Sequence, residues 1–214
     1  MPVFAEDCDY RFYLNTLGEW KSRLHCKVYG FCLMTNHVHL IVDPGEDGAN
    51  LGRLMKRLAA RYTRRVNRLE GRSGTAWNGR FDSSPIDTDQ YLMACCRYVD
   101  LNPVRASIVA DPAEYHWSSC GHRIGQASWP WLDDHPFHLD LGATRAERQA
   151  RYRAWLRDSI PEGEWALIRT AARRGQLTGD KRFQRIVEQR VGQRIALRGP
   201  GRPKKGDRSI FPKK

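Results

Sequence analysis

The amino-acid sequence predicts a protein of the α+β class, with several strands among the helices of its first half and a helical C-terminal part. Residues 24–33 and 37–42 are rich in aliphatic and aromatic side chains, and the short turn between them predicts an antiparallel hairpin. Residues 50–70 instead carry apolar side chains at the spacing of an amphipathic helix. Beyond residue 144 the pattern is helical, without a strand.

The helices and strands expected in the first half are indicated by apolar spacing and by capping residues. The helix over 50–70 places its apolar side chains within an arc of roughly 120° at 3.6 residues per turn. Thr88 is a candidate N-cap, with Asp89 in the first turn of the helix that follows. The expected elements are a helix over 7–21, strands over 24–33 and 37–42, a helix over 50–70, a strand over 77–86 and a helix over 89–101.

The second half is expected to be helical. Asn102 and Pro103 suit an N-cap and a first helical residue, which predicts a short helix over 103–109. The run from Thr144 to Glu147 is a capping box and predicts a helix with Tyr152, Trp155 and Leu156 inward. Further helices are expected over 162–174 and 181–191. The predicted segments are therefore a domain over 1–125, a linker over 126–143, a helical, basic extension over 144–192 that would bind DNA, and a disordered basic tail over 193–214.

Positive charge is concentrated in two zones. The chain has 36 Lys+Arg against 24 Asp+Glu, a formal net charge of +12. Residues 1–144 hold 16 basic and 17 acidic side chains, whereas residues 145–214 hold 20 and 7. Residues 50–72 form the second zone, with eight basic side chains and Glu70 as the one acid. The excess indicates a polyanionic partner, nucleic acid first.

The composition argues against several other classes. No apolar run approaches the roughly 18 residues that a membrane helix needs, so no membrane partner is expected. The first residues lack the basic and apolar regions of a secretory signal, which makes the cytoplasm the expected location. The six cysteines contain no C-x-x-C pair, so we interpret them as reduced thiols. No spacing supports a zinc enzyme or an RNA-modifying enzyme.

Two pairs of residues are candidates for chemistry. His37 and His39 alternate on a strand, so both imidazoles project from one face and suit two ligands of one metal. Tyr98 and Asn102 are four residues apart and share a face of a helix. Taken alone, each pair also fits an ordinary role. The histidines would then be hydrogen-bonded bystanders, Tyr98 a packing residue and Asn102 a cap.

The third candidate is a row of arginines on the helix over 50–70. They carry one sign and have no acidic partner on the helix, so they fit either a solvated face or contacts with nucleic acid. The row consists of Arg53, Arg57, Arg61, Arg64 and Arg68.

Five blocks of sequence, in this order and spacing, resemble the REP-associated tyrosine transposases, which are single-tyrosine transposases of the HUH type. The resemblance covers roughly residues 2–125 and is far more specific than any single block. The blocks are CLMTNHVHLIV (32–42), LGRLMKRLAARYTRRVNR (51–68), WNGRF (77–81), YLMACCRYVDLNPVRA (91–106) and YHWSS (115–119).

The resemblance implies a function and a set of site residues. His37, His39 and Asn102 match the ligands of a Mg²⁺ or Mn²⁺ ion. Tyr98 matches a nucleophile that would form a 5′-phosphotyrosine and leave a free 3′-OH. The implied partner is single-stranded DNA with a hairpin, bound by a monomer or a homodimer. The expected DNA contacts are the five arginines above with Arg80 and Arg105, and Trp77 or Tyr62 would stack on bases unless they lie in the core.

The resemblance also implies a ferredoxin-like antiparallel sheet with helices on one face, and here the chain departs from the pattern. Relatives usually have a strand and a turn before the Pro2–Phe4 block, so the first strand is apparently missing. Without it, the strand over 37–42 would become an unpaired edge. We hypothesise a start codon placed too far downstream, with about 20 residues left out.

Two features leave alternatives open. Gly201 to Lys205 resembles the core of an AT-hook, which would bring Arg202, Lys204 and Lys205 to a minor groove, or it is an unspecific basic tail. The rival to a transposase is a catalytically decayed or noncatalytic DNA-binding protein, such as a repressor of repeat elements. The presence of His37, His39, Tyr98 and Asn102 favours the enzyme, and the missing strand favours decay.

Overall fold

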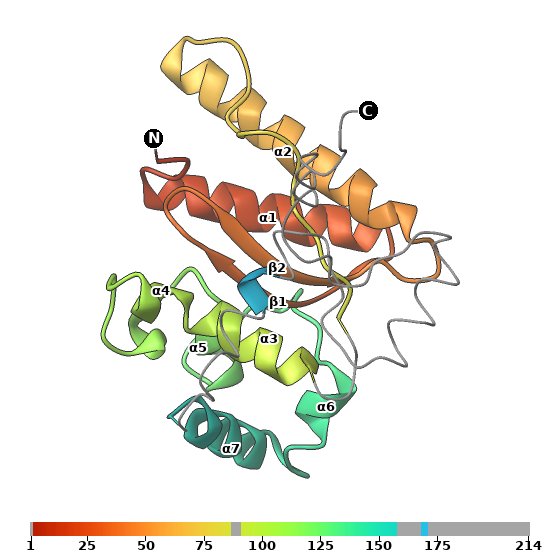
Figure 1. Ribbon diagram of the computed structural model, residues 1–214, viewed down its shortest axis with the longest axis vertical. Helices are drawn as coiled ribbons and strands as arrows, with labels where there is room; N and C mark the ends of the chain where they lie inside the picture. Colours follow the sequence, from red (N-terminus) through yellow and green to blue (C-terminus); the bar gives the residue numbers. More distant parts are fainter. Residues whose placement is uncertain (1, 87–90, 158–167, 171–214) are drawn as a thin grey trace, which may run out of the picture.

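The computed structural model describes residues 2–86, 91–157 and 168–170 and has the expected α+β class. Figure 1 shows two helices above a two-stranded sheet and a group of shorter helices below it. The helices and strands are α1 (Asp7–Arg23), β1 (Lys27–Leu33), β2 (Val38–Asp43), α2 (Ala49–Glu70), α3 (Tyr91–Asp100), α4 (Asn102–Arg105), η1 (Pro112–Glu114), α5 (Cys120–Arg123), α6 (Pro136–Leu139) and α7 (Arg145–Arg157).

The predicted hairpin is confirmed. β1 and β2 pair antiparallel, with Cys32 opposite His39 and an irregularity between Val28 and Gly30. The other edge of β1 is covered by residues 117–119, because Ser119 N–H donates to the Phe31 carbonyl at 2.8 Å. Among the described residues the sheet has two strands, and none pairs with the outer edge of β2.

Helices cover both faces of the sheet, so the expectation of helices on one face needs correction. α1 and α2 pack on the face that holds Val28, Phe31 and Leu33. α3 packs on the opposite face, which holds Tyr29, Cys32 and Ile41. Since strand side chains alternate between faces, the near-continuous burial along β1 is what two covered faces require.

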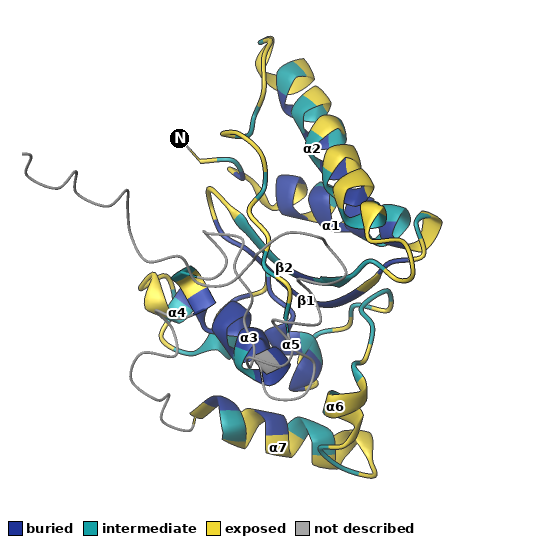
Figure 2. Ribbon diagram, turned by 45° about the vertical axis from the view of Figure 1, so that its right-hand side comes forward, coloured by how far each residue is buried: buried dark blue, intermediate teal, exposed yellow. Residues whose placement is uncertain are grey.

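α2 is amphipathic as predicted. Its buried residues are Leu54, Leu58, Tyr62 and Val66, and they face α1 and the sheet while the outer side is exposed (Figure 2). It ends at Gly71, whose φ of 60° is the left-handed conformation that glycine adopts without strain. None of the described helices is both long and apolar enough to cross a membrane.

The strand expected over 77–86 is wrong. Residues 77–80 form bends and residues 81–85 have no regular structure. Gly79 has a φ of 84°, which no extended strand adopts. The apolar side chain behind the prediction, Trp77, packs instead against Phe4, Tyr13 and Tyr62.

The boundaries around the third long helix differ slightly from the prediction. α3 is described from Tyr91, and the candidate cap Thr88 lies outside the described residues. Leu101, not Asn102, is the N-cap of α4, and α4 ends at Arg105 instead of extending to 109. The side chain of Asn102 turns back to α3 instead of capping the helix that follows.

Helix α7 follows the predicted capping box. Thr144 Oγ1 accepts from Glu147 N–H at 3.2 Å, and the Glu147 carboxylate accepts from Thr144 N–H at 3.3 Å. Tyr152 and Leu156 are buried with Met93, Leu101, Cys120 and Ile124 of the shorter helices and loops. The helices expected over 162–174 and 181–191 lie mostly outside the described residues, and the tail over 193–214 lies wholly outside them.

The segment between α5 and α7 packs against the sheet. The Asp133 carboxylate accepts from Val28 N–H at 2.6 Å and pairs with Lys21 of α1. Trp129 and Trp131 contact Phe31. These contacts join residues 129–133 to the hydrophobic core.

Candidate active site

The two histidines meet at the start of β2. The Nε2 atoms of His37 and His39 are 3.0 Å apart, and their ring planes are nearly perpendicular. The Nδ1 atom of His37 lies 2.7 Å from Asn36 Oδ1. Since that carboxamide oxygen can only accept, Nδ1 carries the proton and Nε2 of His37 keeps its lone pair.

The environment favours neutral imidazoles. Burial lowers the pKa of His37. Burial, with smaller contributions from His37 and Arg105, lowers the pKa of His39 to about 3. Both rings are therefore neutral near pH 7, and a neutral ring is the form that binds a metal.

Tyr98 of α3 lies against this pair. Its ring is edge-on to His39, with the centroids 5.6 Å apart, and 9% of the residue is exposed. This geometry exists because His39 and Ile41 point to the face of the sheet on which α3 packs. The predicted histidine pair and the predicted tyrosine are thus brought together by the fold.

Asn102 is tied to the same helix end. Its Nδ2 donates to the Tyr98 carbonyl at 2.7 Å, and the residue is buried. This bond uses the amide nitrogen and leaves Oδ1 as the oxygen that would meet a hard cation.

The separation of the two histidine nitrogens fits two ligands of one divalent metal. Two nitrogen ligands about 2.1 Å from one ion, at an angle near 90°, are about 3.0 Å apart, as the two Nε2 atoms are here. In the described ranges no three His, Cys, Asp or Glu residues converge on a common point. A metal at this site would therefore need an additional donor such as Asn102 Oδ1.

Arg105 is the predicted DNA-binding residue that lies beside the nucleophile candidate. Its guanidinium carbon is 5.5 Å from the centre of the Tyr98 ring. Arg105 is the last residue of α4, and Asn102 is the first residue of the same helix. Arg105 is exposed and places a positive charge next to the phenol.

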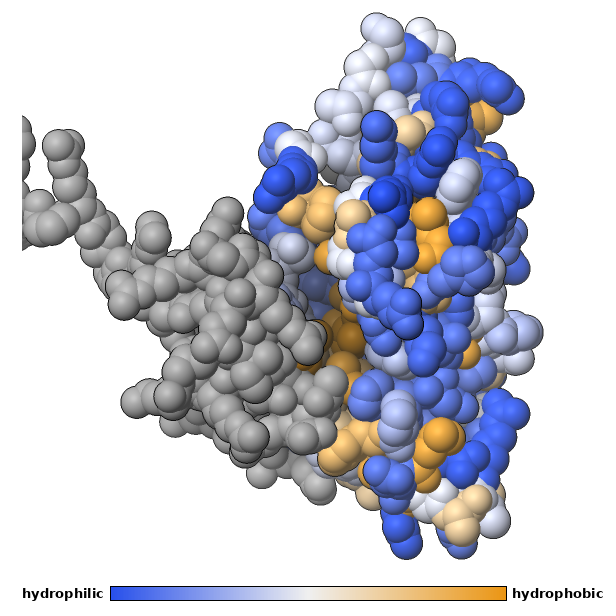
Figure 3. Space-filling model, turned by 90° about the vertical axis from the view of Figure 1, so that its right-hand side faces the viewer, coloured by the Kyte–Doolittle hydropathy of each residue, from blue (hydrophilic) through white to orange (hydrophobic). Residues whose placement is uncertain are grey.

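The arginines of α2 lie on the other side of the sheet, and the structure divides them into two groups. Arg53 pairs with Asp47 at 2.6 Å, and Arg61 pairs with Glu19 of α1. Arg57 lies over the Trp20 ring at 4.6 Å. Arg64 and Arg68 are exposed, and no described carboxylate pairs with either. Figure 3 shows hydrophilic side chains gathered over the upper part of the molecule, at the height of α2.

The remaining DNA-binding candidates have separate positions. Arg80 is exposed in the irregular segment after α2. Tyr62 is 1% exposed and donates to the Val3 carbonyl at 2.6 Å, so it belongs to the core and is not available to stack on a base. Arg202, Lys204 and Lys205 lie outside the described residues.

The sequence patterns missed one buried polar cluster next to the site, formed by Asp100, Ser119, Arg123 and Tyr152. Asp100 lies between Tyr98 and Asn102 and is fully buried. One signal was present in the sequence. Arg123 follows Arg105 as the next Lys or Arg of a segment otherwise poor in basic residues, and an isolated charge among apolar side chains is a candidate for a buried ion pair.

Comparison with known proteins gives one match, to a family model. No curated protein and no solved structure matches the chain. Residues 2–102 match the family model described as "Transposase IS200 like". This segment contains His37, His39, Tyr98 and Asn102. The part of the chain that forms the candidate active site is therefore similar to the IS200-like transposases, which supports a transposase that acts on DNA.

Proposed function

We propose that the protein cleaves and rejoins single-stranded DNA at hairpin-bearing repeat elements, in the manner of the REP-associated tyrosine transposases. The observation that carries the proposal is the contact of the His39 and Tyr98 rings, within a segment that matches the IS200-like transposases. A histidine pair alone is a common pattern, but here it lies against a tyrosine whose carbonyl accepts from the carboxamide of Asn102. Metal-binding donors together with a nucleophile are what phosphoryl transfer needs.

The nucleophilic step uses Tyr98. Its phenolic oxygen attacks the scissile phosphorus, the P–O3′ bond breaks, and a 5′-phosphotyrosine and a 3′-OH result. The phenolic proton goes to solvent and the leaving oxygen takes up a proton. Because the phosphotyrosine keeps the energy of the phosphodiester, attack by a 3′-OH rejoins the strand and releases Tyr98 without ATP.

The neighbouring residues prepare this step. His37, His39 and Asn102 would hold Mg²⁺ or Mn²⁺, which when bound supplies Lewis-acid polarisation of a phosphate oxygen. Arg105 places a positive charge beside the phenol and attracts the scissile phosphate. The His39 and Tyr98 rings meet within one chain, so we propose that a monomer suffices for cleavage.

A covalent adduct tests the proposal. Full-length protein is incubated with 5′- or 3′-labelled hairpin single-stranded DNA and Mn²⁺, and adducts are separated on a denaturing gel. We expect a band that carries the 3′-side fragment, is lost in Tyr98→Phe and persists in Tyr62→Phe, because the Tyr62 hydroxyl is in the distant core.

Two outcomes would reject the enzymatic assignment. One is an adduct that survives Tyr98→Phe. The other is binding of the hairpin DNA without any adduct in the presence of Mn²⁺ or Mg²⁺, which would favour the noncatalytic DNA-binding protein.

A further inference from the structure

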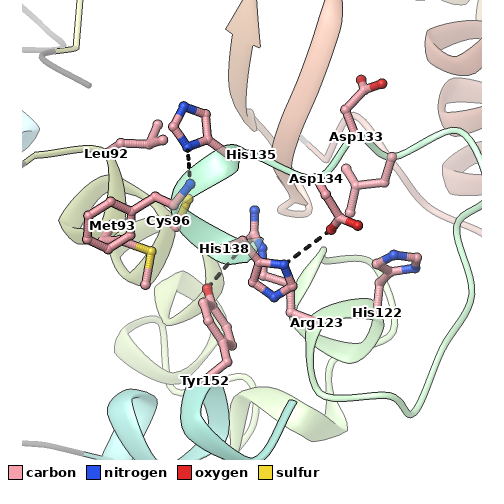
Figure 4. Close-up of a pocket in the computed structure, with 12 residues that line it drawn as sticks. Leu92, Met93, Cys96, His122, Arg123, Asp133, Asp134, His135, His138 and Tyr152 are labelled. Atoms are coloured by element: carbon pink, nitrogen blue, oxygen red, sulfur yellow. Dashed lines mark hydrogen bonds and ion pairs between the residues drawn. The ribbon is translucent and has the colours of Figure 1, made fainter. Parts of the chain in front are cut away.

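A buried polar cluster joins the end of α3 to three other parts of the molecule. Asp100 Oδ1 accepts from Ser119 Oγ at 2.8 Å. Asp100 Oδ2 accepts from Tyr152 Oη at 2.6 Å and from Arg123 Nη1 at 3.1 Å. Asp100, Ser119 and Tyr152 are inaccessible to solvent, and Arg123 is 6% exposed. Figure 4 shows Tyr152 of α7 pointing toward Arg123 of α5.

The cluster and the candidate active site lie on opposite sides of the same helix end. Asp100 is two residues after Tyr98 and two before Asn102, so at 100° per residue it points to the opposite side of the helix end. Tyr98 and Asn102 share one face and Asp100 anchors the other. A shift of this helix end would therefore move both candidate site residues together.

The same cluster is attached to the strand that pairs with the histidine strand. Ser119 Oγ accepts from Phe31 N–H at 3.1 Å, and Arg123 donates to the Tyr29 carbonyl. Phe31 and Tyr29 belong to β1, which holds Cys32 opposite His39. The cluster thus connects the backbone beside His39 with the helix end that carries Tyr98.

Within the cluster, Asp100 accepts the hydrogen bond and Tyr152 donates it. Burial raises the pKa of Tyr152 well above its ordinary value, so its hydroxyl keeps its proton and donates to Asp100. A charge-assisted bond in a buried site is strong, and a buried carboxylate that loses a donor is poorly compensated.

We propose that Asp100, Ser119, Arg123 and Tyr152 are positioning residues that set the distance between Tyr98 and the histidine pair. This inference rests on the proposed function. It also assigns α7, which lies beyond the segment similar to the transposases, to the catalytic unit, and not only to a DNA-binding extension.

Two conservative variants test the inference, and one variant is a matched control. Tyr152→Phe and Ser119→Ala each remove one hydroxyl group that donates a hydrogen bond to Asp100. Tyr62→Phe removes an equally short bond of a buried tyrosine, made to Val3 in the core on the other face of the sheet. A melting curve of each variant shows that it is folded at the assay temperature.

The first readout is the single-turnover rate of adduct formation, with the Kd for hairpin DNA measured separately. We expect both test variants to lower the rate about 10-fold or more with an unchanged Kd, because a displaced nucleophile loses near-attack geometry. Tyr62→Phe is expected to lose stability but not rate. Equal rates in all three variants and the wild type would overturn the inference.

The second readout does not need catalysis. The His39 ring protons lie in the ring-current field of Tyr98, so their NMR chemical shifts report the separation of the two rings. We expect these shifts to move in Tyr152→Phe and Ser119→Ala and to stay in Tyr62→Phe. If the wild type forms no adduct, the proposed function fails. The chemical shifts then still test whether the cluster sets the separation of the His39 and Tyr98 rings. Unmoved shifts refute the positioning role.

Discussion

The imidazole of His39 and the phenol ring of Tyr98 meet edge to face, with centroids 5.6 Å apart. The two residues are far apart in sequence and come from β2 and α3, with α2 between them along the chain. Their contact exists because α3 packs on the face of the sheet to which His39 points. The chemistry proposed for this protein depends on this packing of α3 against the sheet.

A divalent metal is expected to stabilise the folded chain through the histidine pair. Mn²⁺ at about 100 times its Kd raises the free energy of unfolding by about 2.7 kcal/mol, because it binds the folded state and not the unfolded one. The measurement is the melting temperature with and without Mn²⁺. His37→Ala is expected to abolish the shift, and replacement of the exposed His116 by Ala is expected to keep it. A full shift in His37→Ala would show that the metal binds elsewhere.

The metal-free protein is expected to lose stability as the pH falls below about 6.5. The pKa of His39 is lowered to about 3 in the folded chain, so between these values the unfolded chain takes up a proton that the folded chain excludes. His39→Gln removes this difference. Urea unfolding at several pH values between about 4 and 6 should give a shallower pH dependence in the variant, by at most about 1.4 kcal/mol per pH unit. Parallel profiles would contradict the lowered pKa.

The exposed arginines of α2 are expected to contact DNA phosphates. Arg64→Ala and Arg68→Ala should each reduce the slope of log K against log salt by about 0.7 for single-stranded DNA, because each contact releases a counterion. Arg65→Ala is the matched control on the same helix, since Arg65 bonds to Asp9 and lies over the Phe12 ring. The measurement is a salt titration of DNA binding. A slope unchanged by the Arg64 and Arg68 variants would show that these two arginines do not contact phosphates.

Asp133 is expected to hold the segment between α5 and α7 onto the sheet. Asp133→Ala leaves Lys21, whose side chain is 8% exposed, without its carboxylate and leaves Val28 N–H without this acceptor. We expect a loss of about 2 kcal/mol in the free energy of unfolding, less than for a fully buried pair because Asp133 is 30% exposed.

The neighbouring Asp134 provides the comparison for this change. It is 53% exposed and pairs with His138, so Asp134→Ala should cost well under half as much in a urea unfolding curve. Similar losses in both variants would mean that the Asp133 contacts do not hold this segment, which the sequence predicted to be a linker, onto the sheet.

The sequence by itself determined the elements whose signals are local. The spacing of apolar side chains predicted α1 and α2, the hairpin of β1 and β2 followed from two strand patterns around a turn, and Thr144 and Glu147 marked the start of α7. Residue type and spacing also singled out His37 with His39 and Tyr98 with Asn102, while the roles of ligands and nucleophile came from the resemblance of five sequence blocks to a known family.

Only the tertiary structure decided the features that depend on contacts between distant residues. Packing turned the expected strand around Trp77 into an irregular segment, placed Tyr62 in the core and gave Arg53 and Arg61 carboxylate partners from outside α2. It also buried Asp100 with Arg123 and Tyr152, behind the helix face that carries Tyr98. Periodicity reports which face of an element is apolar, but which residues meet across that face is set by long-range packing.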